Sequence, residues 1–522
     1  MSTLAQTNTL TASIVHGKAD TSALIGGIQA RRSSSHASGH KDDYISFRDR
    51  IQQVAVGPRC DNLKSIAVIK FGGSLVDLTG SNISLIVKRI IELKEAKDLG
   101  PLAIFSAPKG VTDRLQSIGE AKALGSDYDL DSIFASYSDF ALRHVVGEQL
   151  LKDCQSVLAG LKNEVEKTLA KVDRRFDGVN RAKVLTSGGE LPTAALMSYV
   201  LNSEAVHSCH LDKVLWPIIT DDIFENATPD YEMSAKNLSG LLSLLEDGKV
   251  VTVGGFLGLT HDGLETVLGR GGSDQTAVFL SRLLSSHFAV ETILFKDTPV
   301  QTADPSIVKD QPLERVPMMT YNEAQKATIA GMNIVQNAAV RIARSHNLTI
   351  MVAPLSNPTL GTMIQRDDTT NQTVKCVTGS RNCAIITMNN EKSRSLEDCL
   401  RLWEDYDGFL DLGAEVMDTG QVLRDFLILD ANFVRKYEKQ LRSFDKEMQV
   451  EYGVGIVTLV GDKMRTSPGI ASKAIHSIPN INIKRGVFAP HTSQVILILN
   501  EADVPDAVRA IHSAIDIGIS SN

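Results

Sequence analysis

Short apolar runs alternate with longer amphipathic segments from Ser65 to about Arg366. The apolar runs predict buried strands, and the segments between them have the apolar spacing of helices. The predicted strands are Ile66–Ile69, Leu102–Phe105, Lys183–Leu185, Val206–Asp212, Val250–Phe256, Thr292–Phe295 and Leu348–Val352. The predicted helices include Asn82–Ala96, Leu142–Val172, Leu191–Leu201 and Asp274–Leu284. This alternation predicts an α/β fold with a mostly parallel sheet between helices, and ligands at the C-terminal ends of the strands.

From Asn371 onward the pattern changes to shorter alternations of strand and helix. The predicted strands are Val374–Thr378, Ala384–Met388, Phe426–Leu429, Gly455–Gly461, Ile481–Val487 and Ser493–Leu499. The predicted helices are Ser395–Tyr406, Gly469–Ser477 and Val504–Ile515. Two βαββαβ-like units in tandem predict a pair of ferredoxin-like α+β modules. A tail that serves only dimerisation is the alternative.

The beginning of the chain has little apolar periodicity. Residues 1–60 are rich in Ser, Thr, Ala, Gly and His, which predicts a disordered N-terminal tail. Import into an organelle is the alternative, although the first arginine occurs only at Arg31 and acidic residues intervene. The predicted boundaries are therefore 1–60 for the tail, 65–368 for the α/β domain, and 372–450 and 453–519 for the two α+β modules.

Composition restricts the classes of partner. Of the 522 residues, 43% are hydrophobic and 22% are charged, as in an ordinary globular protein. The formal net charge of −8 argues against nucleic acid and against an anionic membrane, because both select for basic surfaces. The six cysteines form no CxxC pair, which argues against a zinc ribbon and for a reducing, cytoplasmic location. His207-Ser208-Cys209-His210 fits a structural strand, so we predict no protein metal site.

Two glycine-rich segments carry the candidate chemistry. Lys70-Phe71-Gly72-Gly73-Ser74 follows a predicted strand, and Gly269-Arg270-Gly271-Gly272-Ser273-Asp274 precedes a predicted helix. Glycines let the backbone approach a ligand closely, and the first amides of a helix favour an anion. The planar fork of Arg270 suits a carboxylate or a phosphate. Neither segment has the spacing of a Walker A loop, and a tight turn before a core helix is the alternative for the second.

The pairing of these two segments resembles the amino-acid kinase family, and within it the aspartate kinases. Matching segments are Ser106-Ala107-Pro108-Lys109-Gly110-Val111-Thr112-Asp113, Leu185-Thr186-Ser187-Gly188-Gly189-Glu190 and Phe295-Lys296-Asp297. The resemblance implies an enzyme that uses ATP, with Mg²⁺ bridging the phosphates, to convert L-aspartate to 4-phospho-L-aspartate. That reaction is the first step of the aspartate-family amino-acid pathway or of a specialised pathway derived from it.

The resemblance also implies a role for each candidate residue. Lys70 is the catalytic lysine on the phosphates, and Asp274 is the catalytic aspartate that orients it. Glu190 receives the substrate ammonium and Arg270 its α-carboxylate. The substrate-binding residues are Thr112, Glu190, Arg270 and Ser273. The nucleotide-side residues are Gly72, Gly73, Ser74, Gly271, Gly272, Lys296 and Asp297. No general base is needed, because the acceptor carboxylate is already ionised at neutral pH.

The C-terminal modules resemble ACT modules, which implies a homodimer formed through them and an amino-acid effector. His491-Thr492-Ser493-Gln494 departs from the usual effector stretch, so a weak or altered effector response is expected. Gln301, Asn333 and Ala353-Pro354 also depart from the family pattern. These departures leave two alternatives: a kinase for another acidic amino acid, of the glutamate type, and a non-catalytic amino-acid-binding regulator.

Overall fold

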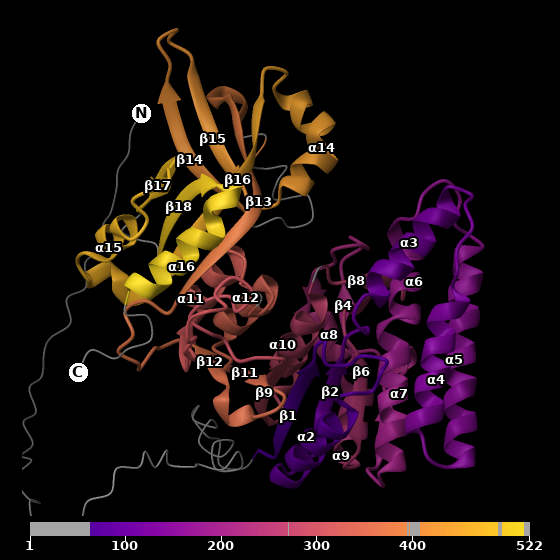
Figure 1. The fold of residues 1–522 in the computed structure, drawn as a ribbon. Coiled ribbons are helices and arrows are strands. Elements are labelled where there is room, and N and C mark those ends of the chain that lie inside the picture. Colours follow the sequence, from indigo (N-terminus) through magenta and orange to yellow (C-terminus); the bar gives the residue numbers. More distant parts are fainter. Residues whose placement is uncertain are drawn as a thin grey trace, which may run out of the picture. The chain divides into compact units, whose positions relative to one another are not determined.

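The computed structural model describes residues 63–269, 271–332, 334–393, 396, 408–488 and 493–515 (Figure 1). The predicted tail at 1–60 lies outside the described residues, as do Arg270, Asn333, His491 and Thr492. The helix predicted at Ser395–Tyr406 also lies outside them, apart from Leu396. The strands of the described residues form three sheets.

The largest sheet has eight strands in the order β10-β12-β11-β9-β1-β2-β6-β3. Every pair in it is parallel except β11 with β12, which confirms the predicted mostly parallel sheet. In chain order its strands are β1 (Ser65–Phe71), β2 (Leu102–Phe105), β3 (Ser208–His210), β6 (Val250–Gly254), β9 (Ala289–Lys296), β10 (Met318–Thr320), β11 (Ile350–Pro354) and β12 (Thr362–Gln365). Phe71 is in register with Phe105 and with Phe295, so β1, β2 and β9 end at one edge.

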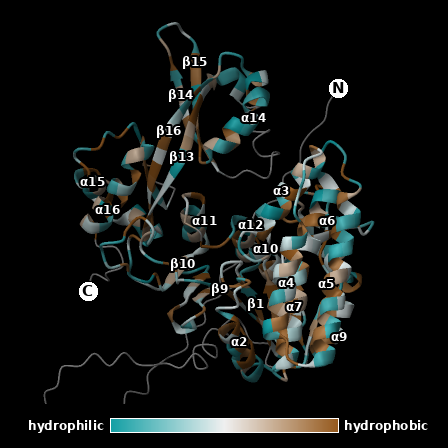
Figure 2. Ribbon diagram, turned by 45° about the vertical axis from the view of Figure 1, so that its right-hand side comes forward, coloured by the Kyte–Doolittle hydropathy of each residue, from teal (hydrophilic) through white to brown (hydrophobic). Residues whose placement is uncertain are grey.

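Helices cover both faces of this sheet. Alternate residues of β1 belong to two separate hydrophobic clusters, with Ile69 in one and Val68 in the other. Helices of the first cluster are α2 (Ile83–Ala96), α3 (Val111–Ala123), α4 (Asp131–His144), α5 (Glu148–Leu169), α6 (Gly178–Gly188) and α7 (Glu190–Ser203). Helices of the second cluster are α8 (Tyr231–Lys236), α9 (Ser239–Glu246), α10 (Gly272–Leu284), α11 (Tyr321–Ile329) and α12 (Asn337–His346). Hydrophilic residues are prominent on the outer helix α5 (Figure 2).

Two sequence predictions are wrong in this region. Lys183–Leu185, predicted as a strand, lies inside α6, because a short apolar run does not distinguish a strand from a buried helical turn. The helix predicted at Leu142–Val172 is two helices, α4 and α5. Gly147, between them, has a φ of +109°, which an α-helix does not accommodate.

A four-stranded sheet of order β5-β4-β7-β8 leads into the second glycine-rich segment. Its strands are β4 (Ile219–Thr220), β5 (Pro229–Asp230), β7 (Leu257–Thr260) and β8 (Glu265–Val267). The backbone N–H of Leu268, after β8, donates to the carbonyl of Phe256 at 2.9 Å, which fixes where the glycine segment begins. Within the described residues, no helix has both the length and the apolar character needed to cross a bilayer.

The third sheet is antiparallel and has the order β14-β15-β13-β16-β18-β17. Its strands are β13 (Cys376–Asn389), β14 (Phe409–Val416), β15 (Val422–Ile428), β16 (Gln449–Val460), β17 (Arg485–Val487) and β18 (Gln494–Asn500). The α-helices that lie wholly within the described residues of this part are α14 (Ala431–Phe444), α15 (Ile470–His476) and α16 (Val504–Ala514). An α+β fold with two ferredoxin-like units is confirmed.

The two units share long strands rather than following one another. Residues 384–389 of β13 pair with β15, and residues 383–387 pair with the first half of β16. Residues 376–380 of the same strand pair with the second half of β16, beside β18. Residues 376–380 therefore form an outer strand of the second unit, although they precede the first unit along the chain. The boundary between the two modules near residue 450 stays a prediction.

Candidate active site

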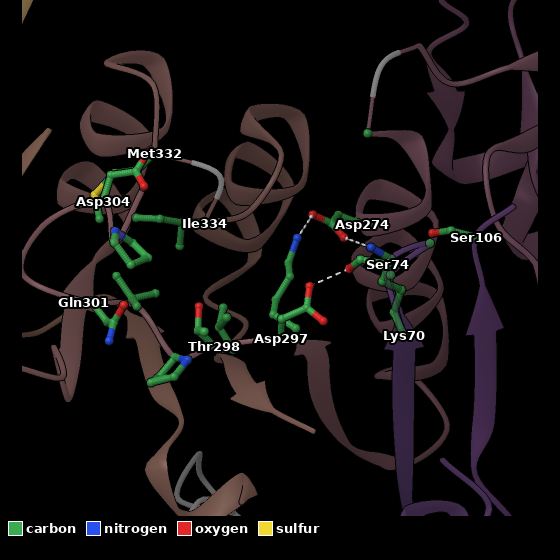
Figure 3. A pocket seen from close by; sticks show the side chains of 18 of the residues that line it. Lys70, Ser74, Ser106, Asp274, Asp297, Thr298, Gln301, Asp304, Met332 and Ile334 are labelled. Carbon is green, nitrogen blue, oxygen red and sulfur yellow. Dashed lines mark hydrogen bonds and ion pairs between the residues drawn. The ribbon is translucent and has the colours of Figure 1, made fainter. Parts of the chain in front are cut away.

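A cavity of about 530 Å³ opens where the central strands of the large sheet end (Figure 3). Residues in the C-terminal parts of β1, β9 and β11 or just after β2 line it, including Lys70, Ser106, Lys296 and Val352. Open α/β sheets bind ligands at this edge, because the loops after parallel strands converge there. The position agrees with the expectation drawn from the alternation of strands and helices.

Most of the predicted site residues meet at this cavity. The predicted residues that line it are Lys70, Gly72, Gly73, Ser74, Gly271, Ser273, Asp274, Lys296 and Asp297. Gly272, Thr112 and Glu190 lie outside the lining. Arg270 lies outside the described residues. Segments that are far apart in sequence thus share one site because the parallel register brings strand ends together.

Lys70 is held at the end of β1 by the packing of its neighbour. The Phe71 ring stacks on Phe105 and on Phe295, with centroids 5.2 and 5.0 Å away. This stack fixes the strand end and directs the Lys70 side chain into the cavity. Only 5% of Lys70 is exposed, and its Nζ lies 2.6 Å from Asp274 Oδ1. Figure 3 shows the two side chains pointing toward each other.

Asp274 connects two lysines at the start of α10. Its Oδ2 lies 3.3 Å from Lys296 Nζ and accepts the backbone N–H of Gln336 at 3.2 Å. Burial raises the pKa of Asp274, but Lys296 and Lys70 outweigh burial and hold it well below the ordinary value. The first turn of a helix also favours a carboxylate. The lining as a whole is formally balanced, with Lys70, Lys109 and Lys296 against Asp274, Asp297 and Asp304. The two ammonium groups that Asp274 holds together are the groups in this cluster that can attract an anionic ligand.

Burial has the opposite effect on the neighbouring lysine. It lowers the pKa of Lys70, Asp274 opposes that shift, and Lys296 adds to it by repulsion. The ammonium form of Lys70 therefore depends on the carboxylate beside it.

The glycines permit close backbone approaches around the lysine. A Cβ at Gly73 would collide with the carbonyl oxygen of Ala107, and the backbone N–H of Lys109 donates to the Gly73 carbonyl at 3.0 Å. Gly271 has a φ of +75°, and a Cβ there would lie 2.6 Å from Gln336 Cγ. Only glycine fits both positions without rearrangement.

Glu190 begins α7 and lies next to the cavity wall. A Cβ at Gly254 would lie 3.2 Å from Glu190 Cβ, and one at Gly255 would lie 2.5 Å from Ser273 Cβ. Glu190 is only 4% exposed, and its Oε2 has no hydrogen-bond partner among the described residues. Burial raises the pKa of Glu190 to about 8, although backbone N–H groups favour the charged form. A buried carboxylate oxygen without a partner suits a cationic ligand group.

The opposite end of the cavity is more apolar. Val300, Met332 and Ile334 line it, and Figure 3 shows Met332 and Ile334 away from Lys70. Sequence reasoning assigned no role to these residues or to Lys109, which also lines the cavity. Lys109 could have been found from the sequence, because it lies between Pro108 and Gly110 in a segment that resembles the family. Nothing local distinguishes Met332 or Ile334 from ordinary core residues.

The oxygen atoms at the charged end differ in their availability for a metal. Both oxygens of Asp274 contact lysines, whereas Asp297 is exposed and accepts Ser74 Oγ on Oδ2 at 2.6 Å. No cluster of three or more His, Cys, Asp or Glu residues that could hold a metal occurs in the part of the chain that the structure describes. A hard cation that brings its own phosphate and water ligands fits such a site, because Mg²⁺ needs few protein ligands.

Comparison with known proteins gives consistent matches. Residues 65–354 match the amino acid kinase family and residues 457–515 match the ACT domain. The lysine-sensitive aspartokinase 3 of Escherichia coli is 24% identical over 86% of this chain and 99% of its own. The chloroplastic aspartokinase 3 of Arabidopsis thaliana is 26% identical over 86% of this chain and 82% of its own.

Solved structures show the same fold. Escherichia coli aspartokinase III in complex with aspartate and ADP has a TM-score of 0.69 at 20% identity, over 86% of this chain and 99% of that chain. The same enzyme with lysine and aspartate has a TM-score of 0.64 at 20% identity, over 86% and 98% of the two chains. The two forms are described as the R-state and the T-state, respectively.

Proposed function

The chain belongs to the amino acid kinase family, and on that premise we propose that it is an aspartate kinase, which transfers the γ-phosphoryl group of ATP to the side-chain carboxylate of L-aspartate. The arrangement of Lys70, Asp274 and Lys296 at the strand ends carries this proposal. Relatives named aspartokinase that match over most of their length support the choice of substrate. The ligands of the Escherichia coli structure, aspartate and ADP, support it further.

The charged end of the cavity suits the phosphates. Phosphoryl transfer needs positive charge on oxygens that gain negative charge, and needs an acceptor held in line. Lys70 and Lys296 supply that charge, and Asp274 holds both ammonium groups in place. The first backbone amides of α10 lie at the same end. Asp297 is the residue that would hold Mg²⁺, which when bound would supply further positive charge for the phosphates. The apolar end, with Met332 and Ile334, suits the adenine base.

The amino acid is recognised on the other side of Ser273. Glu190 pairs with the substrate ammonium, and we propose that Arg270 pairs with the α-carboxylate as a bidentate fork. Thr112 and Ser273 complete the substrate side. The remaining carboxylate of aspartate then faces the phosphates and acts as the nucleophile without a general base, because it is already ionised. A kinase for glutamate would recognise the ammonium and the α-carboxylate in the same way, and would differ in accommodating a longer substrate side chain.

An assay with hydroxylamine tests the proposed reaction, because an acyl phosphate is trapped as a hydroxamate. The full chain is incubated with ATP, Mg²⁺ and either L-aspartate or L-glutamate. We expect hydroxamate with aspartate and at least tenfold less with glutamate. Preference for glutamate would move the chain to the alternative substrate. Binding of aspartate without any hydroxamate would support a non-catalytic regulator.

Aspartate binding is expected to release a proton through Glu190. With a pKa of about 8, the carboxyl group is mostly protonated at pH 7, and a bound ammonium favours the ionised form. Aspartate affinity should therefore rise between pH 6 and pH 8 and level off above the pKa. Calorimetry at pH 7 in phosphate and in Tris, which differ in ionisation enthalpy, measures the protons released. Glu190→Gln should abolish the release and weaken binding about tenfold or more.

Two results would count against that role. Proton release that persists in Glu190→Gln would place the titrating group elsewhere, and so would a flat pH profile in the unmodified chain. Glu204→Gln, on the exposed end of α7, is the matched control.

We propose that the enzyme is a homodimer formed through its C-terminal modules and that an amino acid regulates it there. Residues 65–368 then form the catalytic domain, and 372–450 and 453–519 form the two ACT-like modules. β14 is an edge strand of the C-terminal sheet, and such an edge needs a partner or a cover. Closed two-fold dimers are also the commonest assembly. Light scattering at micromolar concentration should give the mass of a dimer, and a monomeric mass would contradict the proposal.

A further inference from the structure

Part of the cavity wall is built onto the C-terminal sheet. Gln301, Ala303 and Asp304 line the cavity, and we call residues 301–305 the wall segment. Ala303 forms a parallel bridge with Val377 of β13, whose backbone N–H donates to the carbonyl of Thr302 at 2.8 Å. Ala303 is fully buried in the same hydrophobic cluster as residues of β16, β18 and α16. The wall segment therefore packs as part of the second ACT-like module.

Thr302 anchors this segment from behind. It is fully buried and is absent from the cavity lining, although residues on either side of it line the cavity. Its Oγ1 accepts the backbone N–H of Glu314 at 3.2 Å and lies 3.0 Å from Nε2 of His512, a residue of α16. His512 thus reaches the wall without touching the cavity.

The surrounding hydrogen bonds assign the tautomer of His512. The side-chain amide of Gln311 donates from Nε2 to the carbonyl of Arg509 at 3.3 Å, so its Oε1 is the atom 3.0 Å from His512 Nδ1. Nδ1 therefore carries the proton and donates to Gln311. Nε2 is left as the acceptor for the hydroxyl proton of Thr302. Each polar atom in this chain of contacts has a complementary partner.

We propose that His512 is a positioning residue for the nucleotide, acting through Thr302 on the wall segment. The inference rests on the proposed use of ATP in this cavity. Lys70, Asp274 and Glu190 stand on other elements, so the phosphate and amino-acid contacts do not depend on His512. The contribution is preorganisation: a wall that is already in place does not lose conformational freedom when the nucleotide binds.

Two conservative substitutions separate the two nitrogen atoms of His512. Glutamine places an amide oxygen at the distance of Nε2 along the side chain, and asparagine places an amide nitrogen at the distance of Nδ1. His512→Gln should retain the contact with Thr302, whereas His512→Asn retains only the contact with Gln311. We expect His512→Asn to raise KM for ATP about three- to tenfold, with KM for aspartate and kcat within about twofold of the unmodified chain. His512→Gln should stay close to the unmodified chain.

Thr302 provides the reciprocal test. Thr302→Val removes the hydroxyl group at nearly constant volume and should raise KM for ATP by a similar factor, whereas Thr302→Ser should not. The double variant His512→Asn/Thr302→Val should be no worse than Thr302→Val alone, because Thr302→Val already removes the hydrogen bond to His512 together with the acceptor of the Glu314 N–H. His476→Asn, on the exposed face of α15, is the control histidine.

The outcomes distinguish this inference from the proposed function. Calorimetry with ADP measures the nucleotide dissociation constants of the unmodified chain and of the His512 variants, so the same comparison can be made without turnover. Absence of hydroxamate in the unmodified chain would refute the kinase proposal, while calorimetry would still test His512. Equal KM values for ATP in His512→Asn, His512→Gln and the unmodified chain would overturn the positioning role. Parallel losses in kcat, KM for aspartate and melting temperature would also overturn it, because they indicate a general structural role.

Discussion

Lys70→Ala is expected to lower kcat by at least a hundredfold while the chain stays folded. The lysine is buried at the end of the cavity that we propose for the phosphates, where an ammonium would stabilise the charge that develops during transfer. Removal of a single preorganised donor of this kind costs about 10²–10³ in kcat. The rate of ADP formation at saturating aspartate and ATP measures the change, and circular dichroism verifies folding.

The size of that effect separates catalysis from packing. Lys70→Met keeps most of the length of the side chain without its charge and should be as inactive as Lys70→Ala. Lys152→Ala removes an exposed lysine that pairs with Glu148 on α5, and should leave kcat unchanged. A fall of less than about tenfold in kcat, equivalent to ~1.4 kcal/mol in the activation barrier, would remove Lys70 from the catalytic role.

Asp274→Asn is expected to shift the pH dependence of turnover as well as its magnitude. The carboxylate opposes the lowering of the Lys70 pKa by burial, so its neutralisation lowers that pKa further. Because phosphate binding needs the ammonium form, turnover in the variant should begin to fall at a lower pH than in the unmodified chain. We expect kcat to be about ten- to a hundredfold lower at pH 8, and the deficit to narrow toward pH 6.

A pH profile of kcat between pH 6 and pH 9 measures this shift. Asp153→Asn, on the exposed surface of α5, is the control and should superimpose on the unmodified profile. A uniform loss at all pH values would mean that Asp274 acts only by orienting groups and does not maintain the charge of Lys70.

Local sequence signals explain why part of the site was predictable. Lys70 follows an apolar strand and precedes two glycines, and Asp274 opens an apolar helix after three glycines. Each segment could be recognised from the sequence because the strand end or helix start that positions its side chain lies within the segment itself. Lys183–Leu185 was misread because its apolar run carries no period, and burial in α6 decided its conformation.

Long-range contacts explain what the sequence did not reveal. Thr302 and His512 are 210 positions apart, and neither has a neighbour that indicates a contact. Val374–Thr378 and Ala384–Met388 were predicted as two separate strands, whereas both lie largely within the single strand β13. In the structure a register shift between Ser380 and Cys383 carries the strand from the first run to the second, with Asn382 at a φ of +60°.

The continuity of β13 has a structural consequence. β13 runs for 14 residues, and the bulge between Ser380 and Cys383 bends it into two halves that belong to one continuous strand. One half holds the wall of the cavity through Val377, and the other half is an inner strand of the first ACT-like unit. Because one continuous strand joins them, Val377 at the cavity wall and Met388 in the first unit are connected without an intervening loop.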